Sequence, residues 1–156
     1  MSNDTQRTVR ELAEASLGAV RAKDRDGWLA LFEPDATVED PVGPSGLDRE
    51  GRGRRGIEEI AAFYDSTIST MESFEYEIER TYLGGEELAM VVVFHIGLGG
   101  DQRMDMDLVN IYKRSPGGKL AGLRSFWDGS RQGGWHRALT PAQATSSSRA
   151  SSAERA

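Results

Sequence analysis

The segment ATVEDPVG, residues Ala36–Gly43, decides the fold that we predict for this chain. Thr37 and Val38 favour extended backbone, and Pro41 lacks the N–H that a sheet needs, so we expect a short strand from the start of this segment to Asp40. At a strand end, the Asp40 side chain can face the mouth of a cavity. Asp-Pro is also a common turn signal, so the dipeptide alone leaves a purely structural role open.

Three helices are predicted, two before this strand and one after it. The first is amphipathic, with Asn3 or Asp4 as its cap. The second begins at a cap, Asp24, and ends before Pro34. Apolar residues recur at helical spacing in the third. The predicted ranges are Thr5–Arg21, Asp24–Phe32 and Ile57–Ile68.

The second half of the chain is typical of an antiparallel sheet with glycine-rich turns. The predicted strands are Phe74–Tyr82, Leu88–Leu98, Arg103–Arg114 and Lys119–Asp128. In the first of them apolar residues alternate with glutamates, which predicts a half-solvated strand. The side chains predicted to share one face are Phe74, Tyr76, Ile78 and Tyr82.

Helices followed by strands predict an α+β fold: a cone of about three N-terminal helices packed on a curved mixed or antiparallel sheet, with a hydrophobic pocket between the layers. We expect one domain over residues 1–138 and a disordered Ser/Ala-rich tail over residues 139–156.

Composition excludes several classes of function. A net charge of −6 argues against nucleic acid as a partner. No apolar run approaches the roughly 20 residues of a membrane span and no leader opens the chain, so we expect a cytoplasmic protein. The chain has no cysteine and only two histidines, His95 and His136, so we expect no metal and no cofactor.

Three motifs follow one another in a recognisable order: DRDGWLALFEPDATVEDPVG (Asp24–Gly43), IEEIAAFYDSTI (Ile57–Ile68) and GGKLAGLRSFWD (Gly117–Asp128). Together they resemble the ketosteroid isomerase branch of the SnoaL-like, nuclear transport factor 2-like superfamily, over about Thr8 to Gln132. In that branch, the aspartate of VEDP is the general base that moves a proton beside a carbonyl group. The resemblance implies this role for Asp40.

The same resemblance implies further site residues. Phe63 and Trp127 match aromatic wall positions, and such walls would raise the pKa of the Asp40 carboxyl by desolvation. Tyr64 matches a tyrosine that supports the oxyanion donor, and Phe32 stands where one branch carries another tyrosine.

The resemblance fails at the oxyanion donors. Ser16 falls at the position of the catalytic tyrosine, where its short side chain would need a bridging water. Leu108 falls at the position of the acid donor, and the adjacent Asp107 replaces it only if a bulge intervenes. If Leu108 and Tyr112 face the pocket, alternation places Asn110 there too, so Asn110 or Tyr64 could supply a donor; each also has an ordinary structural explanation. The predicted catalytic residues are Asp40, Tyr64 and Asn110, and the predicted substrate-binding residues are Ser16, Phe32, Phe63, Leu108 and Trp127.

Two other features have competing interpretations. The loop Val42–Gly56 is either a solvated, turn-rich segment, which its mixed charges favour, or an anion clamp for a carboxylate or a coenzyme phosphate. Its arginines are Arg49, Arg52, Arg54 and Arg55. His95 has no acidic or histidine partner at ligand spacing, and we expect it to be structural.

Three hypotheses for function follow. The first is an isomerase that resembles steroid delta-isomerase, or a related cyclase or dehydratase, acting on an apolar polycyclic carbonyl compound. The second is a module that binds a steroid- or polyketide-like ligand without chemistry. The third is an assembly or adaptor domain, because folds of this type often dimerise through the sheet. We expect a homodimer with no nucleic-acid or membrane partner.

Overall fold

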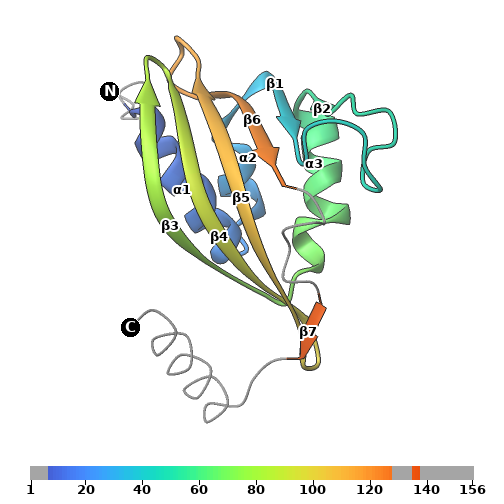
Figure 1. Cartoon of the computed structure of the whole chain (residues 1–156). Coiled ribbons are helices and arrows are strands. Elements are labelled where there is room, and N and C mark those ends of the chain that lie inside the picture. Colours follow the sequence, from blue (N-terminus) through green and yellow to red (C-terminus); the bar gives the residue numbers. More distant parts are fainter. Residues whose placement is uncertain (1–6, 128–134, 138–156) are drawn as a thin grey trace, which may run out of the picture.

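The computed structural model describes residues 7–127 and 135–137, so the tail predicted over residues 139–156 lies outside the described residues. The elements follow in the order α1 (Val9–Arg21), α2 (Arg25–Leu29), β1 (Phe32–Glu39), β2 (Arg54–Arg55), α3 (Ile57–Ser66), the 3-10 helix η2 (Ile68–Thr70), β3 (Ser73–Gly84), β4 (Glu87–Gly99), β5 (Gln102–Arg114), β6 (Leu120–Phe126) and β7 (Trp135–Arg137). This order confirms the predicted α+β class (Figure 1).

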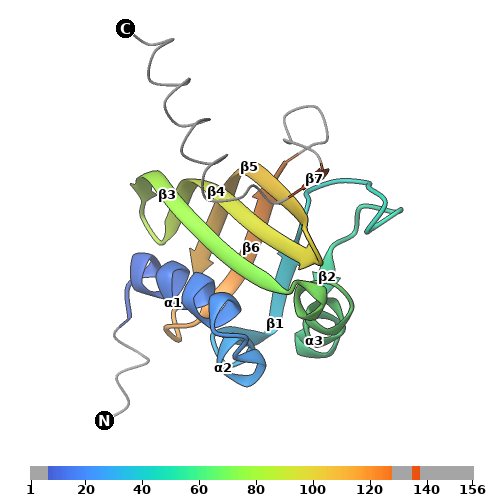
Figure 2. The same cartoon turned by 90° about the horizontal axis from the view of Figure 1, so that it is seen from below.

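One curved sheet forms the larger layer. Its strands lie in the order β2-β1-β6-β5-β4-β3, and β7 pairs separately with β5. β1 runs parallel to β6, whereas all the other pairs are antiparallel, so the sheet is mixed. Helices α1 and α2 lie against its concave side, and α3 stands beside β1 and β2 (Figure 2). The sheet and helices together form the predicted cone.

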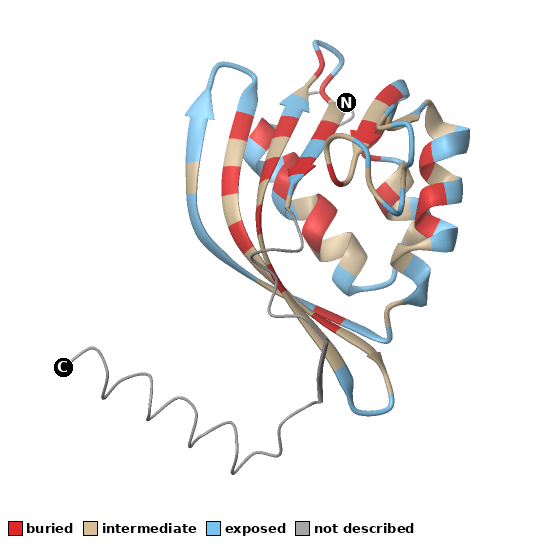
Figure 3. Ribbon diagram, turned by 45° about the vertical axis from the view of Figure 1, so that its right-hand side comes forward, coloured by how far each residue is buried: buried red, intermediate tan, exposed pale blue. Residues whose placement is uncertain are grey.

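The core lies between these two layers. Buried and less buried residues alternate along β4 and β5, as the banding in Figure 3 shows. Their buried side chains face α1 and α2, which place Leu12, Leu17 and Trp28 against them. Successive side chains of a strand point to opposite faces of the sheet, so every second residue of β4 and β5 lies on the inner face.

The first helix begins later than predicted. Thr8, rather than Asn3 or Asp4, caps α1. The Thr8 hydroxyl accepts a hydrogen bond from the Glu11 backbone N–H at 3.1 Å, and the Glu11 carboxylate accepts one from the Thr8 N–H at 3.2 Å. This reciprocal capping box satisfies two backbone donors that the helix itself leaves free.

The second predicted helix was too long. Asp24 caps α2 as expected, but the helix ends at Leu29, and Phe32 already belongs to β1. Phe32 is drawn into the sheet because it pairs with Leu120 of β6, a contact far away in sequence. Pro34 therefore lies inside β1, in a stretch where the pairing with β6 is irregular and a missing N–H is tolerated.

The predicted apolar face of β3 is only partly buried. Phe74 is buried and Tyr76 half-buried, and Ile78 still pairs with buried Val92 on this face although it is 37% exposed. Tyr82 is exposed on the other face, so the prediction was wrong for Tyr82. The pairing with β4 shifts between Ile78 and Arg80, and the extra residue in this bulge turns the later side chains to the other face. β3 is also the edge of the sheet, which leaves it covered on one side only.

The third helix is shorter than predicted: α3 ends at Ser66 and the separate turn η2 follows it. In the described part of the chain, no helix is long and apolar enough to cross a membrane.

The capping box yields a prediction about stability. Thr8→Ala removes the side-chain acceptor at the start of α1, and we expect it to lower the free energy of unfolding by about 1 kcal/mol in urea titrations. Thr8→Ser keeps the hydroxyl and should retain most of the wild-type stability. Equal losses in both variants would contradict the capping role.

Candidate active site

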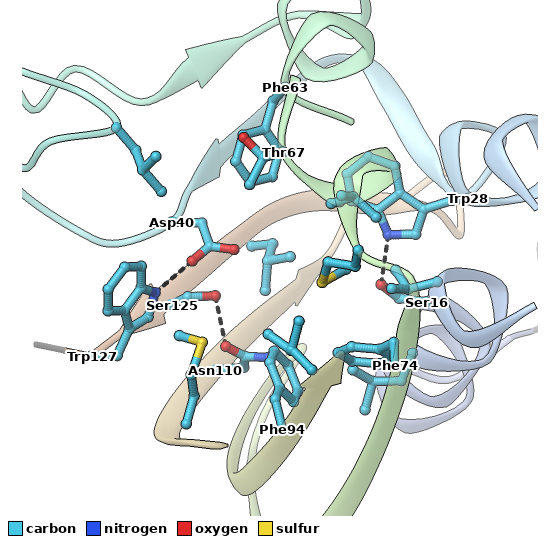
Figure 4. Close-up of a pocket in the computed structure, with 18 of the residues that line it drawn as sticks. Ser16, Trp28, Asp40, Phe63, Thr67, Phe74, Phe94, Asn110, Ser125 and Trp127 are labelled. Carbon is cyan, nitrogen blue, oxygen red and sulfur yellow. Dashed lines mark hydrogen bonds between the residues drawn. The ribbon is translucent and has the colours of Figure 1, made fainter. Parts of the chain in front are cut away.

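A pocket of about 190 Å³ lies between the concave face of the sheet and the helices (Figure 4). Roughly 10–15 Å³ of such space holds one water, so the pocket has room for an organic molecule. Its walls are mostly apolar and rich in rings and thioethers. They include Phe63, Phe74, Phe94, Trp28, Trp127, Met71, Met104 and Met106. This composition suits an apolar ligand.

Asp40 follows β1 and lies half-buried on the pocket wall. The indole N–H of Trp127 donates a hydrogen bond to Asp40 Oδ1 at 2.6 Å (Figure 4). Burial raises the pKa of Asp40, while the Trp127 hydrogen bond and the charge of Arg54 partly oppose the rise. The ionised form is therefore a stronger base than an aspartate in water.

Arg54 connects the loop that follows β1 to the pocket wall. Its Nη2 donates to the Leu47 carbonyl at 2.6 Å, and its guanidinium carbon lies 4.8 Å from the centre of the Phe63 ring. Leu47 and Phe63 both line the pocket. Arg54 Nη1 is also 4.0 Å from the Asp48 carboxylate. This arginine thus packs against the loop and the pocket wall, whereas Arg52 is largely exposed.

Three polar side chains on the sheet form a chain inside the apolar pocket. The Ser125 hydroxyl lies 2.6 Å from Asn110 Oδ1, and Asn110 Nδ2 lies 3.1 Å from the Tyr112 hydroxyl. All three residues are at most 2% exposed, and all three line the pocket. They are neighbours because Asn110 and Ser125 are directly paired across β5 and β6, and Tyr112 is two residues along the same face of β5.

Burial also acts on Tyr112. Desolvation raises the pKa of the Tyr112 hydroxyl, the Asn110 hydrogen bond lowers it, and the charge of Asp40 raises it further. The net result is a pKa well above the ordinary value, so the phenol keeps its proton at neutral pH.

Ser16 lies on the pocket wall, on α1. Its hydroxyl accepts a hydrogen bond from the Trp28 indole N–H at 3.1 Å (Figure 4). Of the predicted site residues, the structure thus brings five to one pocket: Ser16, Asp40, Phe63, Asn110 and Trp127.

Three other predicted residues do not line this pocket. Phe32 and Tyr64 lie behind Trp28: the Phe32 ring is 4.8 Å and the Tyr64 ring 5.5 Å from its ring centre. Leu108 is buried on the inner face of β5, opposite Val92, outside the lining. The structure therefore gives these three residues packing contacts in the core.

The neighbouring acid also stays away from the pocket. The pairing of β4 with β5 is regular from Glu87 to Gly97, so no bulge turns Asp107 inward. It remains on the outer face, opposite Val93.

Tyr112 lines the pocket, in keeping with the alternation along its strand, although it was not among the predicted site residues. Ser125 also lines the pocket, and no prediction from the sequence included it. Ser125 needed the register of the β5–β6 hairpin, which only the pairing of Asn110 with Ser125 fixes.

His95 differs from its prediction in one respect. It lies on the outer face of β4 with two acidic neighbours: Nδ1 is 2.6 Å from Asp105 and Nε2 is 2.9 Å from Glu77. Burial lowers the pKa of His95, but these two hydrogen bonds outweigh it and the net shift is upward. The partners come from adjacent strands, so spacing along the chain could not reveal them. Among the described residues, no group of three or more His, Asp or Glu side chains is arranged to hold a metal ion.

Fold and pocket together define the class of protein, and comparison with known families agrees. The model of the SnoaL-like domain matches residues 13–130, so the chain belongs to the SnoaL-like domain family. This confirms the resemblance predicted from the VEDP, AAFY and closing-strand motifs.

Three individual proteins are similar to this chain. The steroid Delta-isomerase of Nocardioides simplex is 32% identical over 119 residues, which cover 76% of this chain and 89% of that protein. The Delta 5-3-ketosteroid isomerase of a Mycobacterium species has a TM-score of 0.76 at 28% identity, over 82% of this chain and 98% of that one. RV0760c of Mycobacterium tuberculosis, solved in complex with estradiol-17beta-hemisuccinate, has a TM-score of 0.72 at 29% identity, over 78% and 94% of the two chains.

The raised pKa of Asp40 leads to a prediction about stability. Between the unfolded and the higher folded pKa, the folded state binds more protons than the unfolded state, so the free energy of unfolding falls as pH rises through that window. Asp40→Asn removes the buried charge and keeps an oxygen for Trp127. We expect a higher thermal midpoint than wild type at neutral pH, and a smaller difference near the ordinary carboxyl pKa of about 3.9.

The matched control for this measurement is Asp35→Asn, at an exposed position on β1. Its midpoint should stay close to that of the wild type at both pH values. A lower midpoint for Asp40→Asn at neutral pH would contradict the cost assigned to the buried carboxylate.

Proposed function

We propose that this protein transfers a proton beside the carbonyl group of an apolar, polycyclic ketone, with Asp40 as the general base. One observation carries the proposal: among the described residues that line the apolar pocket, Asp40 is the one acidic side chain, and its basicity is increased by burial. The similarity to two steroid isomerases supports the same chemistry.

The reaction follows from what such a carboxylate can do. An Asp40 oxygen takes a proton from the carbon next to the carbonyl, and the C–H electron pair forms a double bond to the carbonyl carbon, leaving an enolate oxygen. Returning that proton to the far carbon of the adjacent C=C gives the conjugated ketone, and the acid becomes a carboxylate again. No atom is gained or lost, so no cofactor is required. A positioned base of this kind typically contributes about 10²–10⁴-fold to the rate.

Trp127 and Arg54 suit this role. The indole N–H bonds one carboxylate oxygen, which leaves the other oxygen for the substrate. Arg54 lowers the pKa of Asp40 through its charge and keeps part of the population ionised despite burial. The pKa of Asp40 thus stays high enough for the carboxylate to take a carbon-bound proton and low enough for it to be ionised at working pH.

The direct test is turnover of a β,γ-unsaturated 3-ketosteroid, followed by the ultraviolet absorbance of the conjugated product. Asp40→Asn should lower kcat by about 10²–10⁴-fold, because the amide cannot accept the proton. Asp35→Asn is the control and should keep full activity. Undiminished turnover by Asp40→Asn would reject the assignment.

A pH profile tests the electrostatic part separately. The acidic limb of kcat/KM should lie above the ordinary carboxyl range of about 3.9, since burial raises the pKa of Asp40. Arg54→Met removes the opposing charge and should move that limb to still higher pH. Arg52→Met, in the same loop but exposed, should leave it in place. A limb that moves in neither variant would contradict the role of Arg54.

A second candidate is binding without chemistry. It is favoured by Ser16, which stands where the family resemblance predicts a tyrosine and which is bonded to Trp28. Tight binding of a steroid phenol, read by quenching of Trp127, with no turnover of any ketone in a panel would support this alternative. The predicted homodimer and the cytoplasmic location stay predictions; sedimentation tests the first.

A further inference from the structure

We infer that Tyr112 donates a hydrogen bond to the ligand, and that the ligand therefore binds with a ketone or phenol oxygen facing Tyr112. This inference rests on the proposed function, because it supplies the donor that stabilises an enolate oxygen. It assigns that donor to Tyr112 of β5, whereas the family resemblance pointed to Ser16 and Leu108 and the strand alternation to Asn110.

The hydrogens of the buried polar chain give it a direction. A hydroxyl has one hydrogen, and an amide has two N–H hydrogens and an acceptor oxygen. The distances fix the direction of the chain: 2.6 Å at Ser125 is typical of O–H···O, and 3.1 Å at Tyr112 is typical of N–H···O. Ser125 therefore donates to Asn110 Oδ1, and Asn110 Nδ2 donates to Tyr112.

This direction leaves the Tyr112 hydrogen without an acceptor among the described residues. Its oxygen accepts from Asn110, and no other hydrogen bond joins the Tyr112 hydroxyl to the described part of the chain. Tyr112 is 0% exposed, yet it lines the pocket. A buried donor without a partner is costly, so an acceptor that enters the pocket gains a bond that the empty protein does not make.

The pocket around this hydroxyl defines the acceptor. Its walls are largely apolar, and Asp40 contributes a negative charge, so a neutral ketone oxygen is admitted more easily than a carboxylate. As an enolate forms, negative charge develops on that oxygen and the same bond becomes stronger. Asn110 and Ser125 act as positioning residues, because each bond in the chain polarises the next.

The helical wall of the pocket has no phenol at the position of Ser16, so we expect the donor to come from the sheet. Ser16 on α1 accepts the indole N–H of Trp28, and its short side chain leaves pocket space where a tyrosine would stand. Tyr112 brings a phenol to the pocket from the opposite layer.

The test compares two probes of similar shape. One is a steroid with a phenolic ring, and the other is the corresponding hydrocarbon without the oxygen. Tyr112→Phe should bind the phenol at least tenfold more weakly and the hydrocarbon as tightly as the wild type, because only the hydrogen bond is lost. On the ketosteroid, kcat should fall about 10²–10³-fold. Tyr82→Phe, at an exposed position on β3, is the matched control and should change neither.

The outcomes separate the two proposals. Unchanged binding of the phenol by Tyr112→Phe overturns the inference, and so does an equal loss for both probes, which would mean that Tyr112 acts by shape alone. If the wild type turns over no ketone but its affinity for the phenol depends on Tyr112, the inference stands and the proposed function fails.

The positioning role is tested at Ser125. Ser125→Ala should weaken phenol binding a few-fold without changing hydrocarbon binding, and Ser125→Thr, which keeps the hydroxyl, should restore it. Loss in both variants to the same degree would overturn the polarising role.

Discussion

The site depends on keeping one carboxylate, Asp40, in an apolar pocket with a single hydrogen bond from the described residues. Taking a charge out of water is unfavourable, and burial accordingly raises the pKa of this group. The Trp127 indole and the Arg54 guanidinium offset part of that cost. The balance leaves a base that is stronger than a solvated aspartate and still able to ionise.

The parallel pairing of β1 with β6 creates this arrangement. Parallel neighbours end at the same edge of a sheet, so the residue after β1 and the residue after β6 come together there. Asp40 and Trp127 occupy those two places, 87 positions apart in the chain. The antiparallel β5–β6 pairing then sets Asn110 opposite Ser125 on the inner face. The polar groups of the pocket thus come mainly from the sheet, and the helices supply mostly apolar walls.

Trp28 divides the helix side into two zones. In front of it lies the pocket with Ser16, and behind it pack Phe32 and Tyr64. The family resemblance had predicted Phe32 and Tyr64 to be site residues. One large side chain, buried and hydrogen-bonded through its only polar atom, therefore separates a binding surface from a structural core.

The sequence by itself determined the α+β class, the family, and the place of Asp40 at a strand end, because these depend on local periodicity and on motifs with fixed spacing. It could not determine that Phe32 opens β1, that a bulge turns Tyr82 outward, or that His95 lies between two acids, because each depends on a partner in another strand. The tertiary structure alone decided that the Ser125 hydroxyl reaches the pocket beside Asn110. The register between β5 and β6 fixes this position, and register arises from pairing between distant segments rather than from the residues of either one.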